Sequence, residues 1–332
     1  MNLHPIWRAL LWPFSLLYGL AARVRVRLYR AGVFKQRRLP GVVISVGNLT
    51  VGGTGKTPLV MWLAERLSAQ GKRVGILTRG YNGAHQTSDE VEMMRRRWGN
   101  KIPVAVGSRR YANGLRLAQQ GVNCFLLDDG FQHLALARNV DIVLLDATDS
   151  LAAARLLPAG RLREPLSALR RADMIVLTRA VATPELEAEI RSRTDAPVFR
   201  AHSRLLDFCE LVAAGRKLSP REMAGQRAFA FCGVGNPQGF FRDLEMADIA
   251  LAGREAFRDH HRYTRRDAER LEDAARRAGA AALVCTEKDA MNLRGVQFRA
   301  LPVFVCRAEL EIVGDFLETV LRVVARRKAG AP

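Results

Sequence analysis

The sequence predicts an α/β protein of two domains, in which parallel sheets are covered by helices. Three observations support this fold class. From residue 41 onward, short apolar runs rich in β-branched residues alternate with helical patterns. The chain has 332 residues, a length that suggests about two domains. The first predicted strand leads through a glycine-rich loop directly into a predicted helix, which is the order of a nucleotide-binding βα unit.

The strands and helices fall into two groups, which we assign to domains 1–200 and 201–332. The first group has predicted strands at residues 42–46, 73–78, 104–106, 124–128, 141–146 and 174–178, with helices that include 57–70 and 109–119. The second group has predicted strands at 228–234, 281–286 and 303–306, with helices at 265–278 and 311–327. Each group therefore predicts a sheet of its own.

An apolar stretch at residues 9–22 lies between Arg8 and Arg23. It is shorter than the roughly 20 residues of a membrane-spanning helix. Its large apolar side chains fall on one helical face, and arginines follow it, so it is predicted to lie in a membrane interface. A helix packed on its own domain is the alternative. The predicted face consists of Trp7, Leu10, Leu11, Phe14, Leu17 and Tyr18.

The glycine-rich loop is predicted to hold the phosphates of ATP together with Mg²⁺. Backbone N–H groups approach phosphate oxygens closely where glycine removes the side chain, and the following helix N-terminus favours negative charge. Lys56 can reach the β- and γ-phosphates, and Thr57 offers its hydroxyl to Mg²⁺. A glycine-rich turn that binds nothing is the alternative. The loop reads Thr50, Val51, Gly52, Gly53, Thr54, Gly55, Lys56 and Thr57.

This loop departs from two known patterns. The standard phosphate loop has glycine at the position of Thr50. It also resembles the deviant loops of partition-type ATPases, which carry a lysine where Val51 stands. The departures argue against membership of the partition group.

A pair of carboxylates, Asp128 and Asp129, ends the apolar run at residues 124–128. Side chains at the carboxyl end of such a strand lie beside the phosphate loop. Asp128 is therefore a candidate ligand of Mg²⁺ or of its waters, and Asp146 is a weaker candidate. Two solvated turn aspartates are the alternative.

The charge balance predicts an anionic partner. The chain has 52 Lys and Arg against 33 Asp and Glu, a formal net charge of +19. Nucleic acid, an anionic membrane and a phosphorylated substrate all fit this excess, and a compositional bias toward arginine is the alternative. Aromatic residues make up only 7% of the chain and no nucleic-acid motif is present, so we expect no nucleic-acid partner.

An ordered set of motifs between residues 45 and 290 resembles the tetraacyldisaccharide 4′-kinase family. Each motif alone is modest evidence, whereas the ordered set is highly specific. In addition to the phosphate loop, the set comprises Arg79-Gly80-Tyr81, Asp89-Glu90, Asp128-Asp129-Gly130-Phe131-Gln132-His133, the segment Leu156 to Pro165, Gly233-Val234-Gly235-Asn236-Pro237, Asp259-His260-His261-Arg262-Tyr263-Thr264 and Thr286-Glu287-Lys288-Asp289-Ala290.

The resemblance implies a P-loop NTPase-like α/β/α sandwich with a second, smaller α/β domain that closes over the nucleotide. It implies transfer of the γ-phosphate of ATP to the 4′-hydroxyl of the tetraacyldisaccharide 1-phosphate lipid A precursor, which gives lipid IVA. It also implies a peripheral enzyme at the cytoplasmic face of the bacterial inner membrane, in contact with an anionic membrane surface. The competing hypotheses are a membrane-recruited ATPase that switches partners and a nucleic-acid-binding NTPase.

The resemblance also implies an acid–base pair. An acid that follows the Arg-Gly-Tyr motif acts as base on the sugar hydroxyl, together with a histidine of the second domain. The matching acid is Asp89, with Glu90 as the alternative, and the histidine is His260 rather than His261. The Asp259-His260-His261 run is otherwise a candidate metal site.

The predicted catalytic set is Asp89, His260, Lys56, Asp128 and Asp129. The arginines of the motifs suit phosphate recognition, because guanidinium binds phosphate bidentately. Glu164 is expected to orient an arginine or a substrate group, and solvated surface charges are the alternative for the arginines. The predicted substrate-binding set is Asn48, Arg79, Tyr81, Arg109, Gln132, His133, Arg163 and Glu164.

Overall fold

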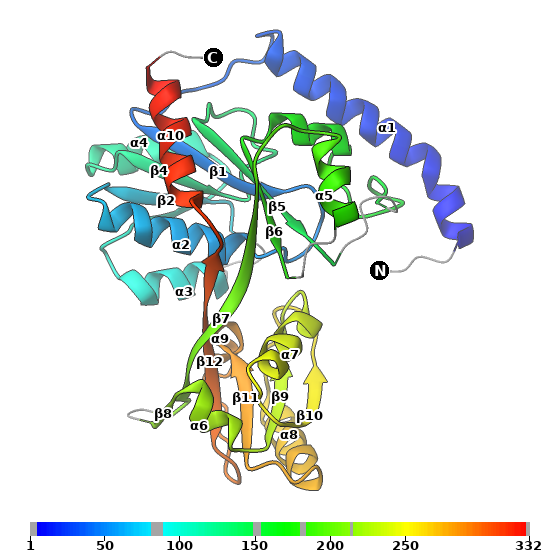
Figure 1. The fold of residues 1–332 in the computed structure, drawn as a ribbon, viewed down its shortest axis with the longest axis vertical. Coiled ribbons are helices and arrows are strands. Elements are labelled where there is room, and N and C mark those ends of the chain that lie inside the picture. Colours follow the sequence, from blue (N-terminus) through cyan, green and yellow to red (C-terminus); the bar gives the residue numbers. More distant parts are fainter. Residues whose placement is uncertain (1–4, 81–88, 149–153, 180–183, 213–214, 330–332) are drawn as a thin grey trace. The chain divides into compact units, whose positions relative to one another are not determined.

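The computed structural model describes residues 5–80, 89–148, 154–179, 184–212 and 215–329 (Figure 1). The chain divides into two compact units. The first comprises Met1–Gln86, Trp98–His202 and Ile312–Pro332, and the second comprises Thr87–Arg97 and Ser203–Glu311. The chain passes between the units within strands β7 (Val198–Glu210) and β12 (Val303–Ile312). The predicted division at residue 200 differs from these units in the placement of residues 89–97 and 312–329.

The first unit is built on a parallel sheet with the strand order β7-β6-β5-β1-β4-β2-β3. Every residue of five of these strands is buried, as expected for a sheet covered on both faces. The strands other than β7 are β1 (Val42–Asn48), β2 (Val74–Thr78), β3 (Val104–Val106), β4 (Cys124–Asp128), β5 (Val140–Asp146) and β6 (Met174–Thr178).

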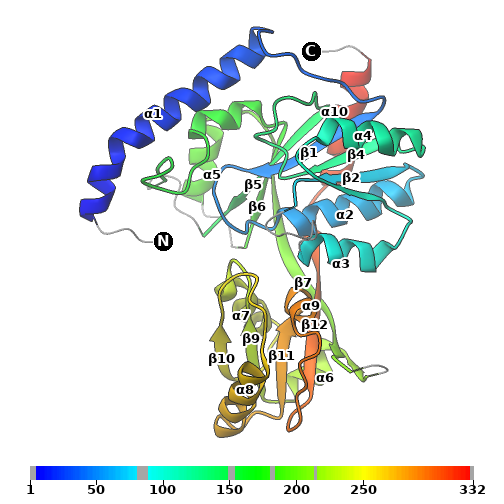
Figure 2. The same ribbon diagram turned by 180° about the vertical axis from the view of Figure 1, so that it is seen from behind.

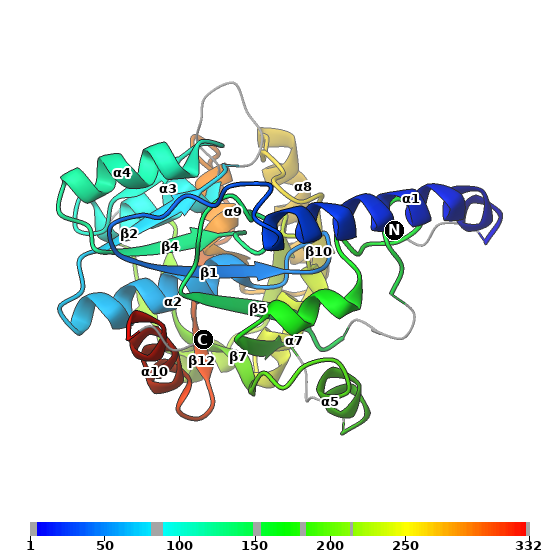
Figure 3. The same ribbon diagram turned by 90° about the horizontal axis from the view of Figure 1, so that it is seen from above.

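Helices lie on both faces of this sheet. Helices α2 (Lys56–Ala69) and α10 (Phe316–Lys328) cover one face, and α4 (Arg110–Gln119) covers the other (Figure 3). Trp62 of α2 packs against Phe316 of α10 with ring centroids 5.8 Å apart. The predicted helix at 311–327 begins later than expected, because β12 continues through Ile312. Two shorter helices follow β5 and β6, namely η1 (Leu166–Arg171) and α5 (Pro184–Arg191).

The second unit carries the strand order β10-β9-β11-β12-β7, which can be followed in Figure 2. Alternate residues of β9 face two different clusters, because successive side chains of a strand point to opposite faces. One cluster holds side chains of α7 and the other holds side chains of α8, so these helices cover opposite faces. The elements are α3 (Asp89–Trp98), β8 (Lys217–Leu218), α6 (Pro220–Ala224), β9 (Ala228–Cys232), α7 (Pro237–Met246), β10 (Leu251–Ala256), α8 (Arg265–Arg277), β11 (Ala282–Thr286) and α9 (Glu287–Asn292).

Helix α1 (Pro5–Arg30) contacts the first unit along a narrow stripe. Ser15 is buried, and Gly19 lies one turn further along the same face, where a Cβ atom would lie 2.6 Å from Cδ1 of Leu156. Most of its large apolar side chains are exposed instead, namely Leu10, Trp12, Phe14, Leu16, Leu17, Tyr18, Leu20 and Val24. The exposed surface is therefore wider than the predicted face. Among the described residues, we find no helix with the length and apolar character needed to span a membrane.

The end of β1 is held tightly against the turn that follows β4. A Cβ atom on Gly47 would lie 2.5 Å from Cβ of Phe131, which is fully buried. Glycine is therefore required at this position for steric reasons, since no real Cβ atom makes so close a contact.

We expect Gly47→Ala to lower the free energy of unfolding by about 1–3 kcal/mol, because overpacking forces the Phe131 turn to move. Thermal unfolding followed by circular dichroism measures this as a lower Tm. Gly225→Ala is the matched control, because Gly225 has a helical φ of −73° and a Cβ atom added there would lie 3.8 Å from the carbonyl oxygen of Glu222, an ordinary contact. Equal Tm values for the two variants would contradict the steric argument.

Candidate active site

The glycine-rich loop follows β1 and ends in the first turn of α2. Gly52 has φ of 128° and Gly55, the N-cap of α2, has φ of 85°, a region that glycine adopts without steric cost. Lys56 is the first residue of α2, and its Nζ donates to the carbonyl of Gly52 at 3.4 Å. Burial lowers the pKa of Lys56, and the nearby Asp129 carboxylate opposes this effect. The loop thus has the backbone geometry and the cation of a phosphate site.

The acidic pair lies at the same edge of the sheet as this loop. Strands β1 and β4 are parallel neighbours with Val46 opposite Asp128, so their carboxyl ends lie at the same edge of the sheet, and β1 continues two residues further to Asn48. Asp129 Oδ1 lies 3.7 Å from Lys56 Nζ. The predicted proximity of the acidic pair and the phosphate loop is therefore present in the structure.

The two aspartates differ in their electrostatic surroundings. Burial, together with the neighbouring Asp129, raises the pKa of Asp128 to about 6. Burial also acts on Asp129, but a 2.8 Å ion pair with Arg163 and the charge of Lys56 outweigh it and lower its pKa. Asp129 also has a positive φ of 51°, a conformation uncommon for non-glycine residues.

The donors near the loop fit a magnesium ion that arrives with a nucleotide. Oδ1 of Asp128 is buried and has no hydrogen-bond partner in the described part of the chain, whereas Oδ2 accepts from Thr78 at 3.2 Å. Mg²⁺ prefers oxygen ligands and is commonly held by one or two carboxylates and the substrate phosphates. Thr57 follows Lys56 in the first turn of α2. Among the described residues, no three potential His, Cys, Asp or Glu ligands gather around one point.

Arg163 connects the acidic pair to the end of β1. Its guanidinium donates to Asp129 Oδ2 at 2.8 Å, to Asn48 Oδ1 at 2.6 Å and to Gln132 Oε1 at 3.3 Å. Gln132 in turn donates to Glu164 Oε1 at 3.2 Å. Four residues of the predicted substrate-binding set therefore form one hydrogen-bonded network with Asp129.

Glu164 at the end of this network is buried and paired with Arg171 of η1. Arg171 Nη1 lies 2.8 Å from Glu164 Oε2. The guanidinium of Arg171 also lies over the ring of Phe131, 4.4 Å from its centroid. Glu164 is thus paired with an arginine that the sequence analysis did not single out, and its expected role in orienting an arginine or a substrate group stays a prediction.

The segment that carries Arg163 runs alongside the phosphate loop. Thr50 and Leu162 form an antiparallel bridge. The Val51 N–H donates to the carbonyl of Arg161 at 2.8 Å, and the Arg163 N–H donates to the carbonyl of Leu49 at 2.7 Å. Residues 49–51 are therefore fixed by a second segment of backbone, which compensates for the loss of the usual first glycine.

Helix α4 contributes a buried arginine that the sequence analysis missed. Arg110 donates to the carbonyls of Asp128 at 2.8 Å and Asp129 at 3.1 Å. The predicted Arg109 is instead the exposed N-cap residue of α4. Arg110 shares the buried face of the helix with Gly114 and Leu117, so the position of α4 on the sheet selects Arg110 rather than Arg109.

Of the remaining members of the predicted substrate-binding set, Arg79 and His133 are not part of the hydrogen-bonded network around Arg163 among the described residues. Arg79, directly after β2, is exposed, and Tyr81 lies outside the described residues. Burial and the charges of Arg110 and Arg138 lower the pKa of His133 to about 4. His133 is therefore neutral near pH 7 and suited to hydrogen bonding rather than to ion pairing.

In the second unit, Asp89 and His260 are in direct contact. His260 Nδ1 lies 2.9 Å from Asp89 Oδ2. This hydrogen bond lowers the pKa of Asp89 and raises the pKa of His260. His260 has a positive φ of 61°, and backbone strain of this kind often occurs at functional sites.

The alternative histidine has a different environment. His261 Nε2 lies 3.2 Å from Asp267 Oδ2, and its ring stacks on Phe257 with centroids 4.6 Å apart. His261 therefore contacts Asp267 and Phe257, whereas His260 contacts the predicted acid.

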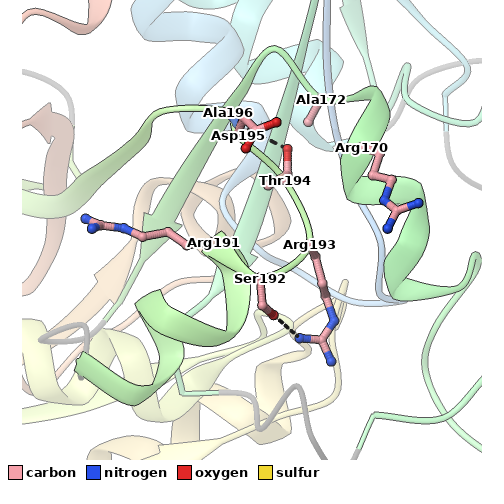
Figure 4. A pocket seen from close by; sticks show the side chains of 8 residues that line it. All are labelled: Arg170, Ala172, Arg191, Ser192, Arg193, Thr194, Asp195 and Ala196. Carbon is pink, nitrogen blue, oxygen red and sulfur yellow. Dashed lines mark hydrogen bonds between the residues drawn. The ribbon is translucent and has the colours of Figure 1, made fainter.

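A separate pocket of about 400 Å³ lies in the first unit, before β6 and β7 begin (Figure 4). Because these strands are parallel to β1, the pocket is at the sheet edge opposite the phosphate loop. Figure 4 shows that the guanidinium of Arg193 donates a hydrogen bond to the hydroxyl of Ser192 in the pocket lining. None of the residues singled out above lines this pocket.

Comparison with known proteins shows the family of the chain. A family model described as tetraacyldisaccharide-1-P 4′-kinase matches residues 7–325. The chain belongs to this kinase family. Relatives named tetraacyldisaccharide 4′-kinase include one from Syntrophobacter fumaroxidans, 41% identical over 91% of this chain and 85% of the relative. Another, from Geobacter metallireducens, is 40% identical over 92% of this chain and 94% of the relative.

A solved structure supports the same membership. The crystal structure of LpxK from Aquifex aeolicus in complex with ATP has a TM-score of 0.70 and 32% identity, covering 96% of this chain and 99% of that chain. The resemblance read from the motifs is thereby confirmed, as is the P-loop NTPase-like α/β/α fold with a second α/β part. The chain is therefore a kinase.

Because the two aspartates have opposite electrostatic environments, we expect replacement of each by asparagine to have opposite effects on the stability of the fold. The raised pKa of Asp128 means that the folded state favours its neutral form, so stability decreases as the pH rises through about 6. At pH 7 we expect Asp128→Asn to raise the free energy of unfolding, by on the order of 2 kcal/mol.

Asp129→Asn is the matched comparison and should lower stability, because it leaves the charges of Arg163 and Lys56 without their carboxylate. Thermal unfolding at pH 7 without nucleotide measures both changes. If both variants move the Tm in the same direction, the assigned charge environments are wrong.

Proposed function

We propose that this chain is an ATP-dependent kinase that phosphorylates the 4′-hydroxyl of the tetraacyldisaccharide 1-phosphate lipid A precursor, giving lipid IVA. The observation that carries the proposal is the Asp89–His260 contact in a chain whose family match also contains an intact Gly-Lys-Thr loop. An ATPase that only switches partners needs the loop but has no need of a base for a sugar hydroxyl.

In the proposed reaction, the phosphates of ATP bind the N–H groups of the loop at residues 50–57, with Lys56 beside the β- and γ-phosphates. Thr57 and Asp128 would hold Mg²⁺, which neutralises phosphate charge when it is bound. Arg163 keeps Asp129 ionised and in place through its 2.8 Å ion pair. Together these residues hold the γ-phosphoryl group in place for attack.

The acceptor hydroxyl is proposed to meet the Asp89 carboxylate. The hydroxyl oxygen forms a bond to the γ-phosphorus while the bond from that phosphorus to the β–γ bridging oxygen breaks, which releases ADP. The hydroxyl proton passes to Asp89. Such general-base assistance commonly contributes about 10²–10⁴-fold to the rate.

The experiment is incubation of the protein with [γ-³²P]ATP, Mg²⁺ and the disaccharide 1-phosphate, followed by separation of labelled lipid. Lys56→Met should abolish transfer, because it removes the phosphate-binding cation. Asp89→Asn should lower kcat by about 10²-fold or more and leave the KM for ATP nearly unchanged.

Arg322→Gln is the control, because Arg322 is an exposed residue of α10 whose ion pair is with the exposed Asp315. No labelled lipid with the wild-type protein would reject the proposed substrate. Unchanged kcat in Asp89→Asn would reject Asp89 as the base and favour Glu90.

We further propose that α1 binds the anionic cytoplasmic face of the inner membrane as a peripheral anchor. Its exposed apolar side chains, including Trp12, Leu16 and Leu17, suit the boundary between headgroups and acyl chains. Arginines at positions 23, 25, 27 and 30 follow them, and each adds about 1 kcal/mol of attraction to an anionic leaflet.

The double substitution Leu16→Glu/Leu17→Glu should weaken binding to vesicles of phosphatidylethanolamine and phosphatidylglycerol by about tenfold or more, because it places charges in the apolar layer. Co-sedimentation with the vesicles measures the bound fraction. Met246→Glu is the control, because Met246 is an exposed apolar residue of α7. Equal binding of the double variant and the control would place the membrane surface elsewhere.

A further inference from the structure

The motif Thr286-Glu287-Lys288-Asp289 forms the start of α9, whose first turn is fixed by a capping box between Thr286 and Asp289. Asp289 is buried, and it also accepts from the Gly233 N–H at 2.7 Å. The carbonyl of Gly233 accepts from the N–H of His260 at 3.1 Å. Helix α9 and the His260 backbone are therefore held to one another through Gly233.

This anchoring directs two side chains of α9 toward the acid–base pair. Lys288 and Asn292 are one helical turn apart and share a face of α9. Lys288 Nζ lies 3.3 Å from His260 Nε2, and Asn292 Nδ2 donates to Asp89 Oδ2 at 2.8 Å. One face of a short helix thus contacts both members of the pair.

The contact with Lys288 fixes where the imidazole carries its proton. A lysine ammonium group only donates hydrogen bonds, so Nε2 of His260 must accept. The ring proton then resides on Nδ1, which donates to Asp89 Oδ2 at 2.9 Å. In this neutral form both ring nitrogens of His260 have a partner.

The hydrogen bond from Asn292 distinguishes the two carboxylate oxygens of Asp89. Both hydrogen bonds given above end on Oδ2. Among the contacts of the described residues, none ends on Oδ1. Oδ1 is consequently the oxygen that can accept a proton from a bound hydroxyl.

We propose that Lys288 and Asn292 are positioning residues, which hold His260 as the neutral Nδ1–H ring and leave Oδ1 of Asp89 as the acceptor of the substrate proton. The role of Lys288 and Asn292 in catalysis rests on the proposed kinase function, whereas the protonation state and tautomer of His260 do not.

The surrounding charges explain why a lysine is needed for this arrangement. His260 faces Asp89 and Glu90 of α3, Asp259 of its own loop and Lys288 of α9. Its Nε2 is 3.8 Å from Glu90 Oε1 and 3.9 Å from Asp259 Oδ1. Lys288 lies between these groups, 3.2 Å from Glu90 and 2.7 Å from Asp259. Without the lysine, three carboxylates would stabilise an imidazolium.

An imidazolium beside Asp89 would weaken that carboxylate as a base. The additional positive charge would lower the pKa of Asp89 and reduce its affinity for the hydroxyl proton. The charge of Lys288 also lowers the pKa of Asp89, but this charge is shared with Glu90 and Asp259, whereas an imidazolium would be in direct contact with Asp89. Burial opposes the lysine charge, but these two carboxylates more than offset it and raise the pKa of Lys288.

The test is a pH titration of the histidine rings in the full-length protein, labelled with ¹⁵N-histidine and observed by two-bond ¹H–¹⁵N NMR. The chain has six histidines, and His260→Gln identifies the His260 signals by their loss. In the wild type we expect the neutral Nδ1–H form at pH 8. In Lys288→Met we expect the His260 midpoint to rise by about one pH unit or more.

Two further variants test whether charge rather than packing causes the shift. Lys217→Met removes another lysine that is paired with an aspartate, Asp207, at 3.0 Å in the same unit, and should leave the His260 midpoint unchanged. Lys288→Met/Asp259→Asn should bring the midpoint back toward the wild-type value. An unchanged midpoint in Lys288→Met, or a wild-type ring protonated on Nε2 at pH 8, would overturn the proposal.

Kinetics then separate the positioning role from the proposed function. In Lys288→Met the acidic limb of the kcat profile should move to higher pH by the same amount as the NMR midpoint, with the KM for ATP unchanged. Asn292→Ala should lower kcat about tenfold, and Asn292→Asp should lower it further, because it places a like charge beside Asp89. A shifted ring midpoint in a protein that labels no lipid would reject only the substrate, whereas a shifted midpoint with an unmoved kcat profile would reject the positioning role.

Discussion

The parallel pairing of β1 with β4 is the constraint on which the phosphate site depends. The register sets Val46 opposite Asp128, so the end of β4 lies beside the last residues of β1, from which the phosphate loop continues. A shift of one residue would turn each β4 side chain to the other face of the sheet, and the acidic pair would no longer reach Lys56. Gly47 reinforces the register, because only a residue without Cβ allows Phe131 to pack against the end of β1.

The same edge of the sheet gathers charges that the rest of the unit must balance. Asp128 is buried, with one oxygen that no described residue pairs, whereas Asp129 is paired with Arg163 and lies near Lys56. The network from Arg163 through Gln132 and Glu164 to Arg171 fixes the orientation of these groups. In this arrangement the buried Asp128 carboxylate can bind Mg²⁺. Without the metal ion, the unpaired charge lowers the stability of the fold.

Sequence patterns predicted those parts of the structure that depend on local order. The loop at residues 50–57 and the pair at 128–129 were predicted from a strand, a turn and a helix that follow one another. The topology then brought both to one edge, since parallel strands share their carboxyl ends. Motif order added the contact between Asp89 and His260, which lie 171 positions apart in the chain.

What escaped prediction depends on distant packing. Arg110 rather than the adjacent Arg109 faces Asp128, because the phase of α4 decides which side is buried, and this requires knowing where the sheet lies. Arg171 reaches Glu164 through the turn of η1, which has no strong sequence signature. Similarly, residues 89–97 lie between strands of the first unit in the sequence, yet they belong to the second unit.

Helix α1 is connected to the phosphate site through a shared segment of backbone. Ser15 accepts from the N–H of Ala159 at 3.0 Å, and Tyr18 donates to the carbonyl of Arg163 at 3.0 Å. The segment containing these residues pairs with Thr50 and Val51 of the phosphate loop. A kinase with a soluble acceptor has no need of such support from an apolar helix. For an acceptor with four acyl chains, these contacts join the exposed apolar side of α1, the proposed membrane-binding surface, to the phosphate loop.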